Sequence, residues 1–181
     1  MLERSKKELR TDAKNIRKKI SLARRLEAKQ EFFKNSFCYE SYPKILSYAS
    51  FEDEFDMWEY NELLAQQGRL LLPKMIENTL HVFYVTDSFQ QLKVGKWGIK
   101  EPDPSLCEEV PLSTLSLVFV PALAFDKNNH RLGYGKGCYD RFLFSVENAI
   151  KSIGIGYKEQ LLPFLLPAEK HDVALSELHL F

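Results

Sequence analysis

Residues 130–141 bring glycines, cations and a carboxylate together within one short segment. Gly133, Gly135 and Gly137 alternate with larger residues. Because glycine adopts positive φ at little cost, such a backbone can curl so that successive N–H groups face one concavity. A concavity of this kind binds anions, although alternating glycines alone are also typical of a flexible turn.

Charged side chains in the same segment favour the anion site over the plain turn. Arg131, Lys136 and Arg141 supply positive charge, and a following helix would direct the positive end of its dipole at the loop. Asp140 could hold a divalent cation next to the same anion. The segment therefore predicts a site for a polyphosphate with Mg²⁺, although its glycine spacing matches neither the P-loop nor the dinucleotide fingerprint.

The flanking segments predict how this loop is positioned. Residues 115–121 form an apolar run that ends at Pro121, which is typical of a buried strand in an α/β sheet. Residues 138–150 have helical spacing. A strand before the loop and a helix after it place the loop at the carboxyl end of a strand, where ligands of open α/β sheets bind.

The N-terminal segment predicts two helices. The first begins at Ser5, which forms a capping box with Glu8. Its apolar stripe has spacings of four, three and four residues, at Leu9, Ala13, Ile16 and Ile20. Ser21 can cap a second helix that runs to about Phe37.

The remaining periodic segments complete an α/β pattern. A third helix is predicted over 57–67, with Gly68 as its stop. Further strands are predicted at 44–49, 69–74, 79–85 and 152–157. The irregular stretch 87–112 is long for a compact domain and is predicted to be a working loop. The expected fold is a single three-layer α/β domain over residues 1–181, with a mostly parallel sheet flanked by helices and the Gly-rich phosphate loop after a strand.

Composition limits the cellular context. Residues 1–34 carry twelve Lys and Arg against five Asp and Glu, although the whole chain is neutral. These charges are spread around amphipathic helices 1–37 and form no basic block, so nucleic-acid binding is not expected. Three cysteines without metal spacing indicate reduced thiols in the cytoplasm. No apolar run approaches the ~20 residues of a membrane span.

Two strings resemble the signature of a known enzyme family. The sequence PALAFD at 121–126 and the sequence RLGYGKGCYDR at 131–141 resemble 5-formyltetrahydrofolate cyclo-ligases, also called 5,10-methenyltetrahydrofolate synthetases. The resemblance extends over nearly the whole chain. It departs from the family pattern in the tail, where Ser176 replaces a usual Asp, and at Cys138, where an aromatic residue is common.

The resemblance implies an ATP site built from the N-terminal helix and the glycine loop. Taken alone, Lys6 and Arg10 are ordinary surface cations, but they fill the family's N-terminal ATP-binding positions. Catalytic charge stabilisation would come from Lys136 and Arg131, and Asp140 with Asp172 would hold Mg²⁺. The implied ATP-binding residues are Lys6, Arg10, Arg131, Leu132, Gly133, Tyr134, Gly135, Lys136, Gly137, Cys138 and Tyr139.

A folate site is also implied by the resemblance. The acidic loop at 52–56 follows the strand predicted at 44–49 and, taken alone, could be a solvated loop. In the family a Glu of this loop binds the pterin, and Glu54 is the expected residue, with Glu52 as the alternative. The other implied substrate contacts are Arg10, Ala49, Tyr134 and Tyr139.

The implied activity is the ATP-dependent cyclisation of 5-formyltetrahydrofolate to 5,10-methenyltetrahydrofolate. The γ-phosphoryl group would activate the formyl oxygen, N10 would attack the formyl carbon, and ADP and phosphate would be released. ATP and 5-formyltetrahydrofolate are thus the expected partners of a cytoplasmic monomer that contacts neither nucleic acid nor a membrane. The alternatives are a nucleotide-binding module without turnover, or another small-molecule kinase.

Overall fold

A computed structural model describes residues 4–95, 98–146, 150–167, 169 and 171–181. Its centre is a seven-stranded sheet in the order β11-β10-β7-β1-β2-β3-β6. The five strands from β11 to β2 are parallel, and β3 and β6 continue the sheet antiparallel. Two pairs of short strands, β4 with β5 and β8 with β9, lie outside it.

The elements have the following bounds. The strands are β1 (Ile45–Leu46), β2 (Leu70–Ile76), β3 (Thr79–Tyr84), β4 (Leu92–Val94), β5 (Lys100–Pro102), β6 (Glu108–Glu109), β7 (Leu117–Val120), β8 (Ala124–Phe125), β9 (Arg131–Leu132), β10 (Lys151–Gly156) and β11 (Glu177–Leu180). The α-helices are α1 (Lys6–Lys19), α2 (Leu22–Asn35), α3 (Trp58–Gln66) and α4 (Cys138–Ser145). The 3₁₀ turns are η1 (Ser36–Tyr39), η2 (Leu112–Thr114) and η3 (Lys158–Gln160).

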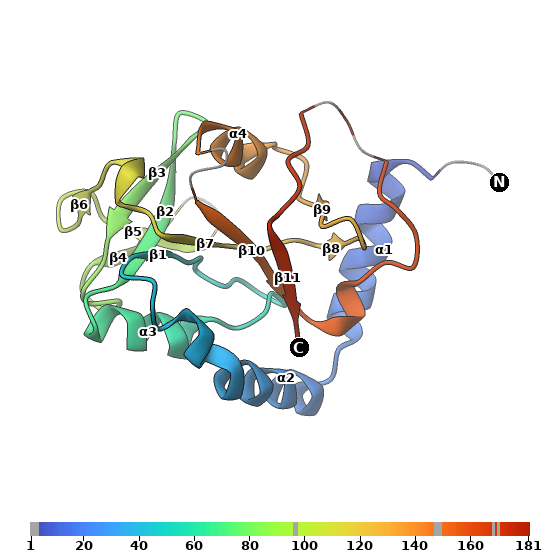
Figure 1. The fold of residues 1–181 in the computed structure, drawn as a ribbon, viewed down its shortest axis with the longest axis horizontal. Helices are drawn as coiled ribbons and strands as arrows, with labels where there is room; N and C mark the ends of the chain where they lie inside the picture. The colour runs from blue at the N-terminus through green and yellow to red at the C-terminus, as the bar shows by residue number, and fades with distance from the viewer. Residues whose placement is uncertain (1–3, 96–97, 147–149, 168, 170) are drawn as a thin grey trace.

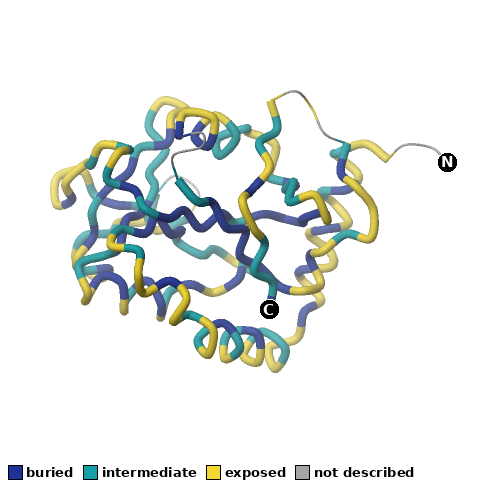
Figure 2. Tube along the Cα trace, in the orientation of Figure 1, coloured by how far each residue is buried: buried dark blue, intermediate teal, exposed yellow. Residues whose placement is uncertain are grey.

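The sheet separates two apolar cores. Successive residues of β7 alternate between them: Leu117 and Phe119 join the core under α2 and α3, while Val118 and Val120 join the core under α4. Alternation arises because neighbouring side chains of a strand point to opposite faces. Figure 1 shows α2 and α3 on one side of the sheet and α4 on the other, and Figure 2 shows the buried strands between them. The predicted three-layer α/β fold with a mostly parallel sheet is confirmed.

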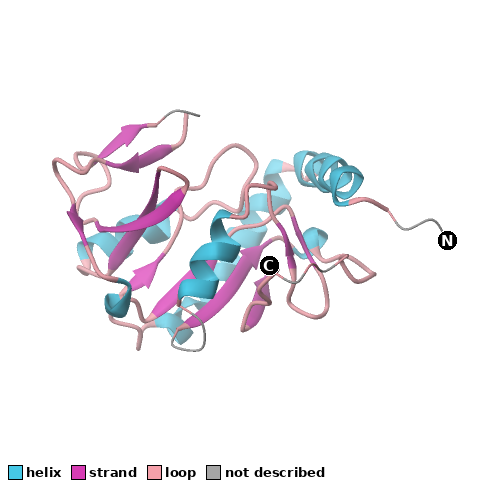
Figure 3. Ribbon diagram, turned by 90° about the horizontal axis from the view of Figure 1, so that it is seen from above, coloured by secondary structure: helices cyan, strands magenta, loops and turns pink. Residues whose placement is uncertain are grey.

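Helix α1 lies beside these layers, near the N-terminus of the molecule (Figures 1 and 3). Its predicted capping box is present, because the Ser5 hydroxyl accepts from the Glu8 amide and the Glu8 carboxylate accepts from the Ser5 amide. Leu9 and Ala13 pack in a third apolar cluster with residues of the β8–β9 hairpin. The helix therefore runs alongside the segment that carries the glycine loop.

The order of the strands creates a crevice beside β1. From β1 the chain passes through α3, on one face, to β2, and from β7 it passes through α4, on the other face, to β10. Since β1 and β7 are parallel neighbours, their carboxyl ends meet where the connections diverge. Ligands of open α/β sheets bind at such a switch point.

Some predicted elements differ in extent. The strand predicted at 44–49 pairs only over Ile45–Leu46, and the helix predicted at 138–150 ends at Ser145, with residues 147–149 outside the described part of the chain. The glycine loop follows the small strand β9 and is separated from β7 by the β8–β9 hairpin. In the stretch 87–112 the structure forms β4, β5 and β6. No helix among the described residues is long and apolar enough to cross a membrane.

Candidate functional site

One cavity of about 510 Å³ lies at the switch point. It is lined by Ala49 after β1, by Pro121 after β7, by the glycine loop and by the N-terminal part of α1. Every residue predicted to bind ATP, folate or metal lines this cavity: Lys6, Arg10, Ala49, Glu54, Arg131, Leu132, Gly133, Tyr134, Gly135, Lys136, Gly137, Cys138, Tyr139, Asp140 and Asp172. The structure therefore brings together segments that are far apart in the sequence.

Two glycines of the loop have backbone conformations that favour glycine. Gly135 has φ +97°, and Gly137, the N-cap of α4, has φ +62°. Gly133 is not among the positive-φ glycines, so the sequence prediction holds for two of the three. A Cβ atom at Gly135 would lie 3.1 Å from Cζ of Arg10, whose Nε donates to the Gly133 carbonyl at 2.9 Å. The Arg10 guanidinium therefore contacts the backbone of the glycine loop directly.

Two ion pairs join the predicted cations to the predicted metal ligands. Lys6 Nζ lies 2.7 Å from Asp172 Oδ2, and Arg131 Nη2 lies 2.5 Å from Asp140 Oδ1. Burial would raise the pKa of the Asp172 carboxyl, but the hydrogen bond from Lys6 lowers it below the ordinary value. Burial lowers the pKa of Arg131, and the Asp140 carboxylate opposes this shift.

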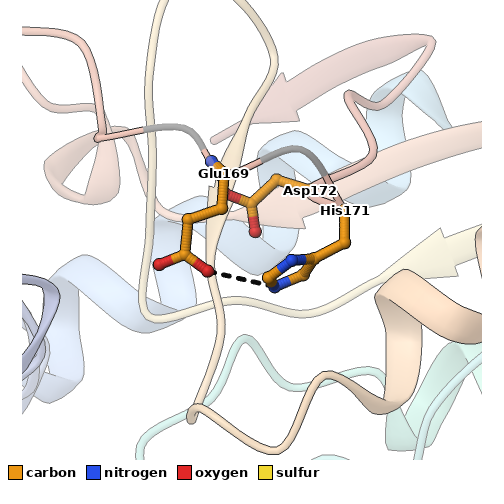
Figure 4. Close-up of side chains that lie close together, drawn as sticks. All are labelled: Glu169, His171 and Asp172. Atoms are coloured by element: carbon orange, nitrogen blue, oxygen red, sulfur yellow. Dashed lines mark hydrogen bonds and ion pairs between the residues drawn. The ribbon is translucent and has the colours of Figure 1, made fainter.

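Beside Asp172, two further side chains could help to hold a cation. Glu169, His171 and Asp172 each offer a ligand atom, and these atoms lie within 4.8 Å of one another. Figure 4 shows the three side chains turned toward a common space, with His171 Nε2 3.1 Å from Glu169 Oε2. Carboxylate oxygens suit Mg²⁺, whereas imidazole is a more usual ligand of transition metals. Asp140 is not part of this three-residue group.

Glu54 lies in the loop between β1 and α3 and contacts the glycine loop. Its carboxylate accepts from the Tyr134 hydroxyl at 2.9 Å and from the Phe51 amide at 3.1 Å. Burial raises the pKa of Glu54, while Arg17 and these two hydrogen bonds oppose the rise. The rival residue Glu52 also lines the cavity but is exposed and sits at φ +51°.

The cations of the loop are used in different ways. Lys136 lines the cavity and is exposed. Arg141, which the sequence placed beside the anion site, instead donates to the carbonyls of Lys136 and Asn78, both at 3.0 Å, and does not line the cavity. Arg141 therefore fastens the loop to the turn between β2 and β3.

The chain matches a known protein family over nearly its whole length. A family model described as the 5-formyltetrahydrofolate cyclo-ligase family matches residues 2–180. The chain belongs to the 5-formyltetrahydrofolate cyclo-ligase family. The family predicted from residues 121–126 and 131–141 is confirmed.

Individual cyclo-ligases resemble the chain over most of its length. The 5-formyltetrahydrofolate cyclo-ligase of Haemophilus influenzae is 29% identical, with 98% of each chain covered. The Escherichia coli K12 enzyme of the same name is 32% identical over 72% of this chain and 74% of its own. The solution structure of Aquifex aeolicus 5,10-methenyltetrahydrofolate synthetase has a TM-score of 0.82 at 28% identity, covering 96% of this chain and 88% of the other.

Several site residues of this cyclo-ligase family member were not predicted from the sequence. Pro73, Met75 and Leu80 of the β2–β3 hairpin line the cavity, and so does Tyr48. Their apolar types are equally typical of core residues, so nothing in the sequence distinguishes them. Arg17 was also missed, although it lies four residues after Ala13 on the buried face of α1. The four-residue spacing of Leu9, Ala13 and Arg17 was an available signal.

Proposed function

We propose that the protein catalyses the ATP- and Mg²⁺-dependent conversion of 5-formyltetrahydrofolate to 5,10-methenyltetrahydrofolate, with release of ADP and phosphate. Membership in the cyclo-ligase family supports this activity. The structural observation that carries the proposal is one cavity that joins the glycine loop to a partly buried carboxylate. The 2.9 Å hydrogen bond from Tyr134 to Glu54 links these two parts directly.

The cavity has two ends with different chemistry. The phosphate end, as we define it, contains the glycine loop with its cations and the paired carboxylates: Lys6, Arg10, Arg131, Lys136, Asp140 and Asp172. The pterin end contains Ala49, Glu54, Tyr134 and Tyr139. An amino-pyrimidine edge offers N–H donors, which a carboxylate held at the end of an apolar cavity accepts well. Glu54 fits this role better than Glu52, since Glu52 is exposed.

The reaction makes few covalent demands on the protein. The formyl oxygen attacks the γ-phosphorus, the bond to the β-phosphate oxygen breaks, and ADP departs. N10 then bonds to the formyl carbon and loses its proton, and the carbon–oxygen bond breaks to release phosphate. Positioning and charge stabilisation supply the catalysis. Lys136, Arg131 and the loop N–H groups offset the negative charge that develops on the transferred group.

A divalent cation fits the acidic residues of the phosphate end. Asp140 and Asp172 would hold it, and Glu169 lies within reach of the Asp172 carboxylate. Oxygen donors of this kind suit Mg²⁺. When bound, the ion would offset phosphate charge and orient the polyphosphate.

The proposal extends to the oligomeric state, the cellular compartment and the partners of the protein. A single domain over residues 1–181 would work as a cytoplasmic monomer without nucleic-acid or membrane partners. The position of the basic helix α1 supports the absence of a nucleic-acid role, because Lys6 and Arg10 face the cavity and Arg17 is buried. These three cations are therefore not available to an exposed basic surface, which leaves Lys7, Lys14, Lys18 and Lys19 as the exposed cations of the helix.

Incubation with Mg-ATP and 5-formyltetrahydrofolate tests the proposal. The expected product has a conjugated methenyl chromophore that appears together with one ADP and one phosphate. ADP formation with a phosphorylated product and no chromophore would favour another small-molecule kinase. ATP binding without turnover would favour a nucleotide-binding module.

A further inference from the structure

Behind the pterin end, a buried arginine reaches two loops at once. Arg17 Nη2 donates to Asp53 Oδ1 and to the Tyr134 hydroxyl oxygen, both at 2.7 Å. The Tyr134 hydroxyl in turn donates to Glu54 at 2.9 Å. One guanidinium from α1 thus connects the acidic loop after β1 to the glycine loop, and the Tyr134 hydroxyl links it to the proposed pterin carboxylate.

The burial of Arg17 is unusual for a residue of a surface helix. Its side chain is 2% exposed, and that of Asp53 is 12% exposed. Arg17 Nη1 donates to the Ala122 carbonyl at 3.2 Å. Arg17 Nε and Asp53 Oδ2 have no hydrogen-bond partner among the residues described. Burial alone would lower the pKa of Arg17, but Asp53 and Tyr134 raise it, so the cation persists.

Simple packing does not account for a cation at this place. A buried ion pair contributes little net stability, and apolar side chains of similar size in place of both Arg17 and Asp53 would fill the space without burying two charges. The Arg17 guanidinium has one consequence that an apolar residue cannot reproduce: it fixes the hydroxyl of Tyr134. With Arg17 as its donor, the hydroxyl oxygen has its own proton left to give to Glu54.

We infer that Arg17 is a positioning residue for the folate substrate, which aims the Tyr134 hydroxyl at Glu54 and keeps the Glu54 carboxylate ionised for the pterin. This inference rests on the proposed role of Glu54 as the pterin ligand. It assigns to Arg17 an action through Tyr134 and through its charge, without contact to the substrate.

The surroundings of Glu54 determine the sign of its pH dependence. Burial raises its pKa above the ordinary 4.5, the Arg17 charge and the Tyr134 hydrogen bond lower it, and Asp53 raises it. Charged and titratable groups face it from every side: Arg17, Asp53, Tyr134, Tyr48 and Tyr139 near the carboxylate, and Arg25 and Tyr157 near the backbone of the loop. Of these groups, Arg17 is the one whose positive charge acts on the Glu54 carboxylate and favours its ionised form.

Loss of Arg17 should therefore move the acidic limb of folate binding. As pH falls through the pKa of Glu54, the carboxylate is protonated and can no longer accept two bonds from the amino-pyrimidine. Without Arg17 the pKa is higher, so the KM for 5-formyltetrahydrofolate should begin to rise at a higher pH than in the wild type. The KM for ATP should not share this shift.

The test compares Arg17→Met with Lys18→Met, an exposed cation of the same helix. Steady-state constants for both substrates would be measured between about pH 5 and pH 9. For Arg17→Met we expect the KM for folate to rise about tenfold or more, and the acidic limb to move up by about one pH unit. Lys18→Met should match the wild type. A reduced kcat with an unmoved acidic limb would overturn the inference and leave Arg17 a purely structural residue.

A double variant separates this inference from the role of Glu54. If Arg17 acts through Glu54, Arg17→Met should add little to the folate KM once Glu54→Gln is present. Additive effects would overturn the inference. If Glu54→Gln alone leaves folate binding intact, the proposed pterin ligand is wrong, whatever Arg17 does.

Milder variants keep the test decisive if Arg17→Met does not fold. Tyr134→Phe removes the hydroxyl at a residue that is 51% exposed and leaves the Arg17–Asp53 pair in place. It should raise the folate KM and shift the acidic limb upward. Arg17→Lys keeps the charge and should hold the limb near its wild-type position. A larger upward shift of the acidic limb in Arg17→Lys than in Tyr134→Phe would overturn the inference.

Discussion

The two ends of the cavity are assembled in different ways. At the phosphate end, residues 131–140 supply most of the lining from one continuous segment, which carries an exposed cation, Lys136, and a buried one, Arg131. At the pterin end, Ala49 and Glu54 come from the loop after β1 and Tyr134 comes from the glycine loop, and the cation that joins these two loops, Arg17, is buried. A continuous segment can be identified from its own residues, whereas the contacts between two loops, such as those of Arg17, become visible only in the folded chain.

The positive charges at the two ends also differ in their freedom to move. An exposed cation such as Lys136 can follow a group whose charge changes during the reaction, while the buried Arg17 is fixed by Asp53 and cannot. We therefore expect loss of Lys136 at the phosphate end to change kcat most, and substitutions at the pterin end to change the KM for folate.

Lys136→Ala should have the largest effect. Lys136 sits between the two glycines of positive φ and lines the cavity, so its ammonium can approach the transferred phosphoryl group. If this contact strengthens in the transition state, kcat and kcat/KM should both fall by about 10² to 10³. Steady-state kinetics would measure the loss, with Lys127→Ala, an exposed lysine outside the cavity, as the control.

A normal kcat with only a raised KM for ATP would contradict this prediction. The loop would then bind the nucleotide equally in both states, and charge stabilisation would fall to Arg131 and the metal. Circular dichroism on the variant would confirm that the substitution in the glycine loop has not unfolded the protein.

Glu54→Gln should come next, and its effect should be confined to the folate. A charge-assisted hydrogen bond in a buried site contributes about 1.5 to 3 kcal/mol, which corresponds to roughly 10- to 150-fold in affinity. Isothermal titration with each substrate separately would show a loss for 5-formyltetrahydrofolate and little change for ATP. Glu52→Gln is the matched control, and a folate loss in that variant instead would move the assignment to Glu52.

Arg17 shows why the phosphate end is easier to predict from the sequence than the contacts behind the pterin end. The predicted apolar stripe of the first helix contained Ile16, but Ile16 is 40% exposed and Arg17 occupies the buried face with Leu9 and Ala13. A periodicity based on hydrophobic residues excludes an arginine. The four-residue spacing from Ala13 places Arg17 on the buried face, but its partners Asp53 and Tyr134 are distant in sequence, so only the tertiary contacts identify them.

The strand before the pterin end shows a second limit of sequence patterns. Residues 44–49 have the composition of a strand, but only Ile45–Leu46 pair with both β2 and β7. Beyond Ser47 the chain leaves the sheet, and Tyr48 and Ala49 line the cavity. Likewise the two-residue strands β8 and β9 are too short to produce a recognisable alternation. The capping box at Ser5, by contrast, depends on residues three apart and was predicted correctly.

Lys6→Ala should have a smaller effect, which is expressed in the KM for ATP. Lys6 lies on α1 and contacts Asp172 at 2.7 Å and Glu169 at 3.3 Å, so it belongs to the same side of the phosphate end as the proposed metal ligands. Its side chain is 19% exposed, which places its contribution at the low end, about tenfold in KM. The neighbouring exposed Lys7→Ala serves as the control. A kcat loss as large as that of Lys136→Ala would show that α1 takes part in the chemistry.

Cys138→Ser should have the smallest effect, although the residue lies inside the signature segment. The Cys138 thiol lies 3.8 Å from the Lys136 carbonyl and 3.9 Å from Arg141 Nη2, which are weak contacts that a hydroxyl can replace. No step of the reaction uses a thiolate, so kcat/KM should stay within about threefold of the wild type. Cys38→Ser, at an exposed cysteine far along the chain, is the matched control. Complete inactivation of a folded Cys138→Ser protein would mean that the first residue of α4 does more than pack. The loop would then contribute to catalysis through Cys138 as well as through Lys136.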